Sequence, residues 1–166
     1  MNIRKAKSSD VRPVTKVHVE SWKTTYKNIF PEDFLESISF DKRYKLWERI
    51  LNSSGEELVY VLEVENKVIG FLSAGPAREK NFNYDAEIYA LYLLKKYQNK
   101  GYGKKLLNES FKYIKEEGYD SIYLWVLKAN PSVEFYKKMA GEKVKESKIE
   151  IADNSYNEIA FAWNHL

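Results

Sequence analysis

The chain has 166 residues, of which 44% are apolar and 31% charged, a composition typical of a globular domain rather than a disordered segment. It has no cysteine, which excludes disulfides, thiolate catalysis and zinc–thiolate sites. The net charge of +3 is too small to indicate a nucleic-acid-binding protein. We expect one cytoplasmic domain over residues 1–166, because the chain shows neither a signal peptide nor an apolar run that could span a membrane.

The first half of the chain is predicted to contain helices followed by strands. Apolar residues three and four positions apart and the capping run Ser8-Ser9-Asp10 indicate helices, whereas clusters of branched and aromatic residues indicate strands. In chain order these elements are a strand at 2–7, a helix that ends near residue 26, helical pieces from 31 and at 41–51, and strands at 57–65 and 67–74 with a tight turn at Asn66-Lys67. A polar loop at 76–84 follows.

The second half is predicted to alternate strands and helices before a closing hairpin. The run Ala86–Leu94 is almost continuously apolar, which predicts a strand buried on both faces. The other elements are a helix at 104–117, a strand at 121–127, a helix from Asn130-Pro131 to Gly141, and strands at 142–152 and 156–163 around an Asp153-Asn154 turn. Because residues 87–127 should form a right-handed parallel unit, we predict an α/β fold with a mixed, mostly antiparallel central sheet flanked by helices.

The most informative segment is the glycine turn, Gln98-Asn99-Lys100-Gly101-Tyr102-Gly103. A glycine-rich turn before a helix gathers free backbone N–H groups at the positive end of the helix dipole, and such a place binds phosphate. The lysines around it, at 95, 96, 100, 104 and 105, form either a solvated face or an attractive surface for an anion. Leu106 stands where the dinucleotide fingerprint needs its third glycine, and the P-loop Gly-Lys-Ser/Thr is absent.

The pattern Gln-x-x-Gly-x-Gly resembles that of the GNAT family of acyl-CoA-dependent N-acetyltransferases. Three features carry the resemblance: the run Glu87–Leu94 that leads through Tyr97 into the glycine turn, Asn130 followed by the segment Phe135–Gly141, and the order of elements along essentially the whole chain. The resemblance implies the acyl-CoA N-acyltransferase fold of this family, with acetyl-CoA as the co-substrate and no metal ion.

The resemblance also implies which residues hold the cofactor. Backbone groups of residues 91–93 would pair with the pantetheine arm like an added strand, and Asn130 would hydrogen-bond the same arm. The N–H groups of residues 99–104 would hold the pyrophosphate, because the lack of a Cβ at the two glycines allows phosphate oxygens to approach. The expected cofactor-binding residues are Leu91, Tyr92, Leu93, Gln98, Asn99, Lys100, Gly101, Tyr102, Gly103, Lys104, Asn130 and Tyr136.

Two residues are expected to carry the chemistry. The resemblance makes Tyr136 the general acid toward the leaving thiolate, although it lies six residues after Asn130 where many family members have seven, and a core aromatic residue is the alternative. An amine must also lose a proton, and a carboxylate on a buried strand suits this task. Glu87 stands eleven residues before Gln98, as the catalytic base does in histone-acetyltransferase members, or else it marks the exposed start of a strand.

The resemblance also implies the acceptor side, which would include the loop 76–84 and the aromatic residues Trp22, Tyr26, Phe30 and Phe34. Aromatic rings beside a polar loop can hold an amine, although Trp22 and Phe30 can equally be core residues. The hypothesis is direct transfer of an acetyl group to a primary amine of a small molecule or peptide, with no nucleic-acid or membrane partner and with a homodimer left open. The alternative is a non-catalytic domain of the same family that binds acyl-CoA as a sensor.

Overall fold

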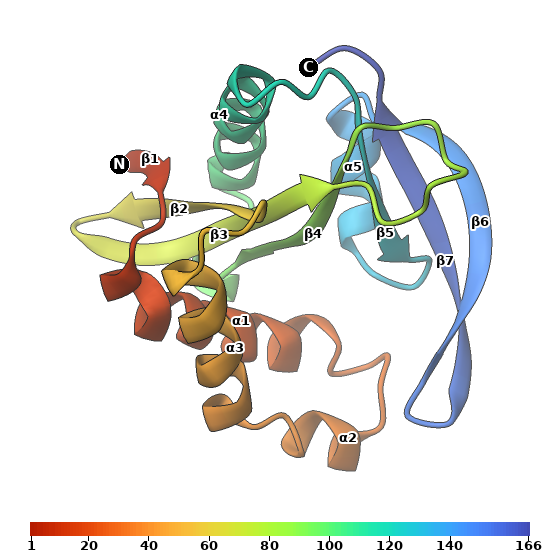
Figure 1. Cartoon of the computed structure of the whole chain (residues 1–166). Helices are drawn as coiled ribbons and strands as arrows, with labels where there is room; N and C mark the ends of the chain where they lie inside the picture. Colours follow the sequence, from red (N-terminus) through yellow and green to blue (C-terminus); the bar gives the residue numbers. More distant parts are fainter.

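The computed structural model describes residues 1–166 as one seven-stranded sheet with helices on both faces (Figure 1). The strands are β1 (Asn2–Lys5), β2 (Leu58–Val64), β3 (Lys67–Pro76), β4 (Ala86–Leu93), β5 (Ile122–Leu127), β6 (Glu142–Ile151) and β7 (Asn154–Trp163). Their order is β1-β2-β3-β4-β5-β7-β6, and every neighbouring pair is antiparallel except β4 and β5, which are parallel. The predicted mixed, mostly antiparallel α/β fold is confirmed.

The helices divide between the two faces of the sheet, as Figure 1 shows for α1 and α3 on one side and α4 on the other. They are α1 (Val11–Thr25), α2 (Glu32–Glu36), α3 (Phe40–Asn52), α4 (Tyr102–Glu116) and α5 (Ser132–Lys138), with 3₁₀ turns at Ser8–Asp10 and Lys95–Tyr97. Strand β2 serves both layers, since Val59 and Val61 pack with α1 and α3, whereas Tyr60 and Leu62 belong to the larger core under α4. None of the helices combines the length and apolar character that crossing a membrane requires.

Both hairpin turns lie one residue earlier than predicted. The β2–β3 turn is centred on Glu65 and Asn66, with φ of 51° and 60°, and the β6–β7 turn on Ala152 and Asp153, with φ of 51° and 59°. Two-residue hairpins of this kind need a positive φ at both central positions, and a short amide or carboxylate side chain tolerates that conformation. The Asn and the Asp therefore occupy the second central position of each turn.

Several other boundaries differ from the prediction by one to three residues, and two of these differences have a clear local cause. Helix α4 begins at Tyr102, two residues before the expected start, because Gly101 caps it in the left-handed conformation with φ of 80°. Strand β1 ends two residues early, because the backbone N–H of Lys7 donates to the carboxylate of Asp10 at 2.9 Å and turns toward the 3₁₀ segment. Neither shift changes the order of the elements.

The prediction that β4 is buried on both faces is wrong beyond its first residues. Only Ala86 and Glu87 pair with β5, after which the two parallel strands diverge. On the other side β4 pairs with β3 and carries a bulge at Tyr89. Residues 89–93 are consequently half-buried, although they are as apolar as a buried strand would be. On the β5 side these residues have no neighbouring strand.

Candidate active site

The divergence of β4 and β5 opens a cavity of about 750 Å³. Its walls come from β4, the glycine turn, the first turn of α4, β5, α5, the end of α1 and the β6–β7 hairpin. Of the residues expected to bind a cofactor, all line the cavity except Lys100 and Tyr102. The structure thus brings together residues that the sequence separates by more than forty positions.

The glycine turn forms one wall, and its shape depends on Gly101. The left-handed backbone of Gly101 directs the chain into α4, and a Cβ built on this residue would meet no protein atom within 4 Å. The space above Gly101 is therefore open to a ligand. Gly103 already lies inside the helix, and a Cβ there would lie 3.4 Å from the ring of Phe135. Gln98 ties the turn to the end of β4 by donating from Nε2 to the Leu93 carbonyl oxygen at 3.0 Å.

Three lysines line the cavity. Lys95 and Lys104 flank the glycine turn, and Lys138 extends from α5. The other members of the predicted lysine cluster do not line the cavity: the ammonium groups of Lys96 and Lys100 lie 5.0 and 5.9 Å from the ring centre of Tyr97. Lys95 and Lys104 therefore stay the predicted anion-attracting members of the cluster, whereas Lys96, Lys100 and Lys105 do not line the cavity.

Asn130 and Tyr136 reach the cavity from the segment after β5. The side-chain Oδ1 of Asn130 accepts a hydrogen bond from the Ser132 N–H at 2.8 Å, which fixes the buried amide at the start of α5. Tyr136 lies on α5 and is only 6% exposed, packed in the core yet on the cavity wall. Burial raises the pKa of Tyr136 above its ordinary value of 10, so the phenol stays protonated at neutral pH.

The aromatic residues of the first helical region form the opposite wall. Trp22, Tyr26 and Phe30 all line the cavity, with ring centres 4.9 Å apart for the first two and 4.8 Å apart for the last two. Phe34 does not line the cavity and instead packs edge-on against Phe30 at 5.5 Å. Phe30 is also 5% exposed, so it is a core residue that lines the cavity, and its acceptor-side role stays a prediction.

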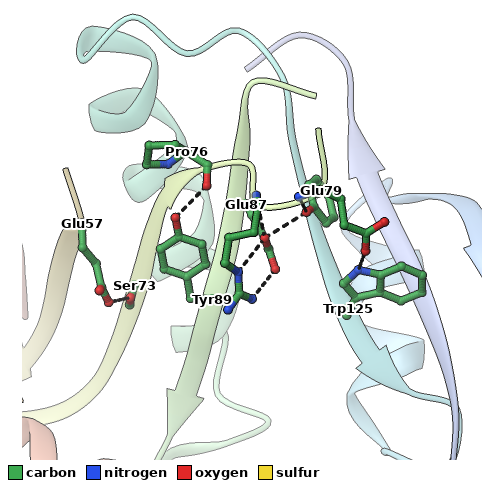
Figure 2. A network of polar contacts seen from close by, with 9 residues as sticks. Glu57, Ser73, Pro76, Glu79, Glu87, Tyr89 and Trp125 are labelled. Atoms are coloured by element: carbon green, nitrogen blue, oxygen red, sulfur yellow. Dashed lines mark hydrogen bonds and ion pairs between the residues drawn. The ribbon is translucent and has the colours of Figure 1, made fainter. Parts of the chain in front are cut away.

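Glu87 is buried, at 2% exposure, but it does not line the cavity. Its carboxylate accepts hydrogen bonds from the Arg78 backbone N–H at 3.2 Å, from Arg78 Nε at 2.9 Å and Nη2, and from the Tyr123 hydroxyl at 2.9 Å (Figure 2). The residue is therefore not an exposed strand end. To take a proton from an amine, this carboxylate would first have to release one of its present donors, so the base role stays a prediction.

The cavity is also lined by residues that the motifs do not predict, among them Trp125 on β5 and Glu158 on β7. The indole N–H of Trp125 donates to Glu79 of the β3–β4 loop at 2.8 Å (Figure 2). Glu158 is half-buried, and burial raises its pKa above the ordinary 4.5. The alternation along β7 carries a signal for Glu158, because it places this charged residue on the same face as Tyr156 and Ala160.

The chain matches known proteins over nearly its whole length. It is 38% identical over 167 residues to the N-acetyltransferase YuaI of Bacillus subtilis, a match that covers 100% of this chain and 94% of that protein. It is 32% identical over 152 residues to a spermidine N(1)-acetyltransferase of Thermoplasma acidophilum, covering 89% and 91% of the two chains.

Solved structures show the same fold. The PaiA N-acetyltransferase of Thermoplasma acidophilum, in complex with coenzyme A, superposes with a TM-score of 0.71 at 27% identity, covering 95% of this chain and 96% of that one. A ribosomal-protein-alanine N-acetyltransferase of Brucella melitensis shares the fold with a TM-score of 0.77 at 18% identity, covering 99% of both chains. The model of the Acetyltransferase (GNAT) family matches residues 19–141, and the chain therefore belongs to the GNAT family and is an acyltransferase.

Proposed function

We propose that residues 1–166 form one domain that transfers an acetyl group from acetyl-CoA directly to a primary amine of a small molecule or peptide. The observation that carries this proposal is the single cavity between β4 and β5, which has a glycine turn and lysines on one side and a carboxylate on another. The spermidine N(1)-acetyltransferase of Thermoplasma acidophilum, a relative at 32% identity, supports an amine as the acceptor.

The residues present fit acetyl-CoA. The open space above Gly101 and the N–H groups at the start of α4 suit a pyrophosphate, whose charge Lys95, Lys104 and Lys138 would balance. The remaining expected contacts of the turn, at Lys100 and Tyr102, would come from backbone N–H groups. Beyond Glu87, β4 has no strand partner on the β5 side, so the main-chain groups of residues 91–93 on that side, apart from the Leu93 carbonyl that accepts from Gln98, are free to pair with a pantetheine arm.

When bound, acetyl-CoA supplies an activated acetyl thioester. Tyr136 would donate its phenolic proton to the thiolate sulfur as it leaves, a role for which its raised pKa keeps the proton available. Asn130, with its amide fixed by the Ser132 N–H, would position the pantetheine arm beside Tyr136. The chain has no cysteine to carry an acyl group, which favours a complex of enzyme and both substrates.

Calorimetric titration with acetyl-CoA, followed by assays of thiol release against alkylamines, polyamines, amino acids and peptides, tests this proposal. We expect saturable binding of acetyl-CoA and thiol release that depends on the amine. Absence of acetyl-CoA binding would refute the proposal. Binding without thiol release for every amine would instead favour the acyl-CoA sensor.

A further inference from the structure

Glu158 occupies a distinct place in the cavity wall. On β7 it lies directly opposite Leu127 of β5, and the period of two along a strand puts Trp125 on the same face as Leu127. Across the hairpin Glu158 is opposite Ser147 of β6, and Ile149 follows on the same face. Leu127, Trp125 and Ile149, which neighbour Glu158 on this face of the sheet, also line the cavity.

The acidic and basic residues that line the cavity come from different secondary-structure elements. Glu158 is the only acidic residue that lines it, and the basic residues are Lys95, Lys104 and Lys138 of the loop, α4 and α5. Lys95 and Lys104 lie at the end of β4 and in the first turn of α4, where an anionic ligand is expected, whereas Lys138 lies on α5, after β5. Glu158 lies on β7, which pairs with β5 on the side away from β4. The part of the cavity next to β4 and the glycine turn thus suits an anion, and the part next to β7 suits a cation.

The charged groups near Glu158 leave it unpaired. Glu79 of the β3–β4 loop, Glu87 of β4 and Lys145 of β6 are the charges that act on it. Lys145 is already engaged, because its ammonium group donates to Glu79 at 3.1 Å and lies 5.7 Å from the ring centre of Trp125. No hydrogen bond or ion pair of the chain uses the Glu158 carboxylate, in contrast to Glu87. Its lone pairs are available to a ligand.

We propose that Glu158 binds the acceptor as an ammonium ion and is the base that takes its proton. This inference rests on the proposed function and assigns the acceptor half of the same cavity. The burial and the two nearby carboxylates that raise the pKa of Glu158 make it a better base than an exposed glutamate.

The proton and electron balance is complete with residues of this chain. One N–H proton of the ammonium group passes to the Glu158 carboxylate, and the freed nitrogen lone pair attacks the thioester carbonyl carbon. A C–N bond forms, the C–S bond breaks with its electron pair on sulfur, and Tyr136 protonates the sulfur. The amide nitrogen then loses its second proton to the Tyr136 phenolate, and Glu158 releases its own to water. The products are an N-acetylamine, free CoA and one proton.

The same surroundings indicate the class of acceptor. Ile149, at 36% exposure, and Trp125 offer apolar surface beside Glu158, and Ile151 lines the same cavity farther along β6. An ammonium group on a flexible alkyl chain would place its charge on Glu158 and its methylene groups on these side chains. An α-amino acid would bring its own carboxylate toward Glu158, and that like-charge contact disfavours it. The inferred acceptor is a primary alkylamine without an adjacent carboxylate.

The experiment compares Glu158→Gln, Glu158→Asp and the wild-type chain. The readouts are kcat and KM for 1,4-diaminobutane between pH 5.5 and 9.5, and calorimetric Kd for acetyl-CoA. Glu150→Gln is the matched control, because it removes a carboxylate from an exposed position of the same hairpin outside the cavity. We expect Glu158→Gln to lower kcat/KM by about 10²-fold or more and to abolish the acid limb of its pH profile. Glu158→Asp should restore part of the rate, and acetyl-CoA affinity should not change.

Tryptophan fluorescence gives a second readout that does not require turnover, since Trp22 and Trp125 line the cavity. Titration of the acetyl-CoA-free chain with the diamine should saturate, and Glu158→Gln should weaken the binding at least about tenfold, the loss of one charge-assisted contact. A Glu158→Gln variant with wild-type kcat/KM, or no diamine binding to the wild-type chain, would overturn the inference. Either result leaves the proposed function standing if acetyl-CoA binds and another amine is acetylated.

Discussion

Arg78 and Glu87 form an ion pair between an exposed and a buried residue: the Arg78 side chain is 66% exposed, whereas the Glu87 side chain is 3% exposed. Arg78 belongs to the loop after β3, and Glu87 to the second position of β4. The pair fixes the start of this loop against the sheet, and the loop in turn holds Glu79 on the indole of Trp125 (Figure 2). Glu87 thereby influences the cavity through the position of a loop.

Arg78→Ala should destabilise the protein, because it leaves a buried carboxylate without its countercharge. We expect the free energy of unfolding to fall by about 1–3 kcal/mol, the usual cost of an unsatisfied buried polar group. Urea denaturation at pH 7 measures it. Lys80→Ala, in the same loop at an exposed position without an ion pair, is the control. Equal stability of both variants would contradict the structural role of the pair.

Glu87→Gln separates positioning from catalysis. If Glu87 holds the loop, kcat should fall less than in Glu158→Gln, and the acid limb of the kcat/KM profile should persist, because the ionising base remains. Steady-state kinetics across pH provides the measurement. Loss of the acid limb in Glu87→Gln alone would assign the base to Glu87, as the sequence first suggests.

Tyr136→Phe should lower kcat by about 10²–10⁴-fold, the range for loss of a general acid. The ring keeps its packing against Phe161 and Trp163, so stability and acetyl-CoA affinity should hardly change. Single-turnover thiol release measures the rate, and calorimetric titration measures the affinity for acetyl-CoA. Wild-type kcat in this variant would leave Tyr136 as a core residue only.

Gly101→Ala and Gly103→Ala should have different effects. A left-handed backbone costs a non-glycine residue about 1–2 kcal/mol, so Gly101→Ala should lower both the free energy of unfolding and the affinity for acetyl-CoA. Gly103→Ala should spare stability, since only Phe135 lies near its new methyl group, but should still reduce affinity. Urea denaturation measures the free energy of unfolding of each variant, and calorimetric titration measures its affinity for acetyl-CoA. Equal stability losses would contradict this assignment.

His18 should make stability fall at acidic pH. Burial, with a smaller contribution from Arg43, lowers its pKa from 6.5 to about 3, and its Nδ1 accepts a hydrogen bond from Trp47 Nε1 at 3.0 Å. Between these pKa values the unfolded chain binds the extra proton, so stability is complete above pH 6.5 and falls as pH decreases toward 3. From pH 6.5 to 5 the loss should be about 2 kcal/mol. His18→Gln, which keeps an acceptor for Trp47, should lack this component in urea denaturation.

The local parts of the site could be predicted from the sequence, because a turn and a helix start are encoded by neighbouring residues. The glycine turn, Asn130 and Tyr136 are of this kind, and the structure places all three on one cavity. The order of strands and helices was accessible for the same reason, since hydrophobic periodicity is a local property.

The remaining features depend on contacts between distant segments. The sequence of β4 does not predict its separation from β5, because a residue beside a cavity can be as apolar as a residue beside a strand. The pairing of Glu87 with Arg78 depends on the path of a polar loop. The alternation along β7 indicates a charged residue on the same face as Tyr156 and Ala160. The position of Glu158 opposite Leu127, however, follows only from the order of the strands in the sheet.

The two residue pairs Ala86–Ile122 and Glu87–Tyr123 are the only pairs that join β4 to β5. The sheet is in effect two ladders, β1–β4 and β5–β7–β6, held along a short seam. The hydrogen bond from the Tyr123 hydroxyl to Glu87 lies on this seam. The contacts at the seam therefore set the angle between the two ladders. Substitutions at the seam would change the width available to both substrates without altering a residue that touches either one.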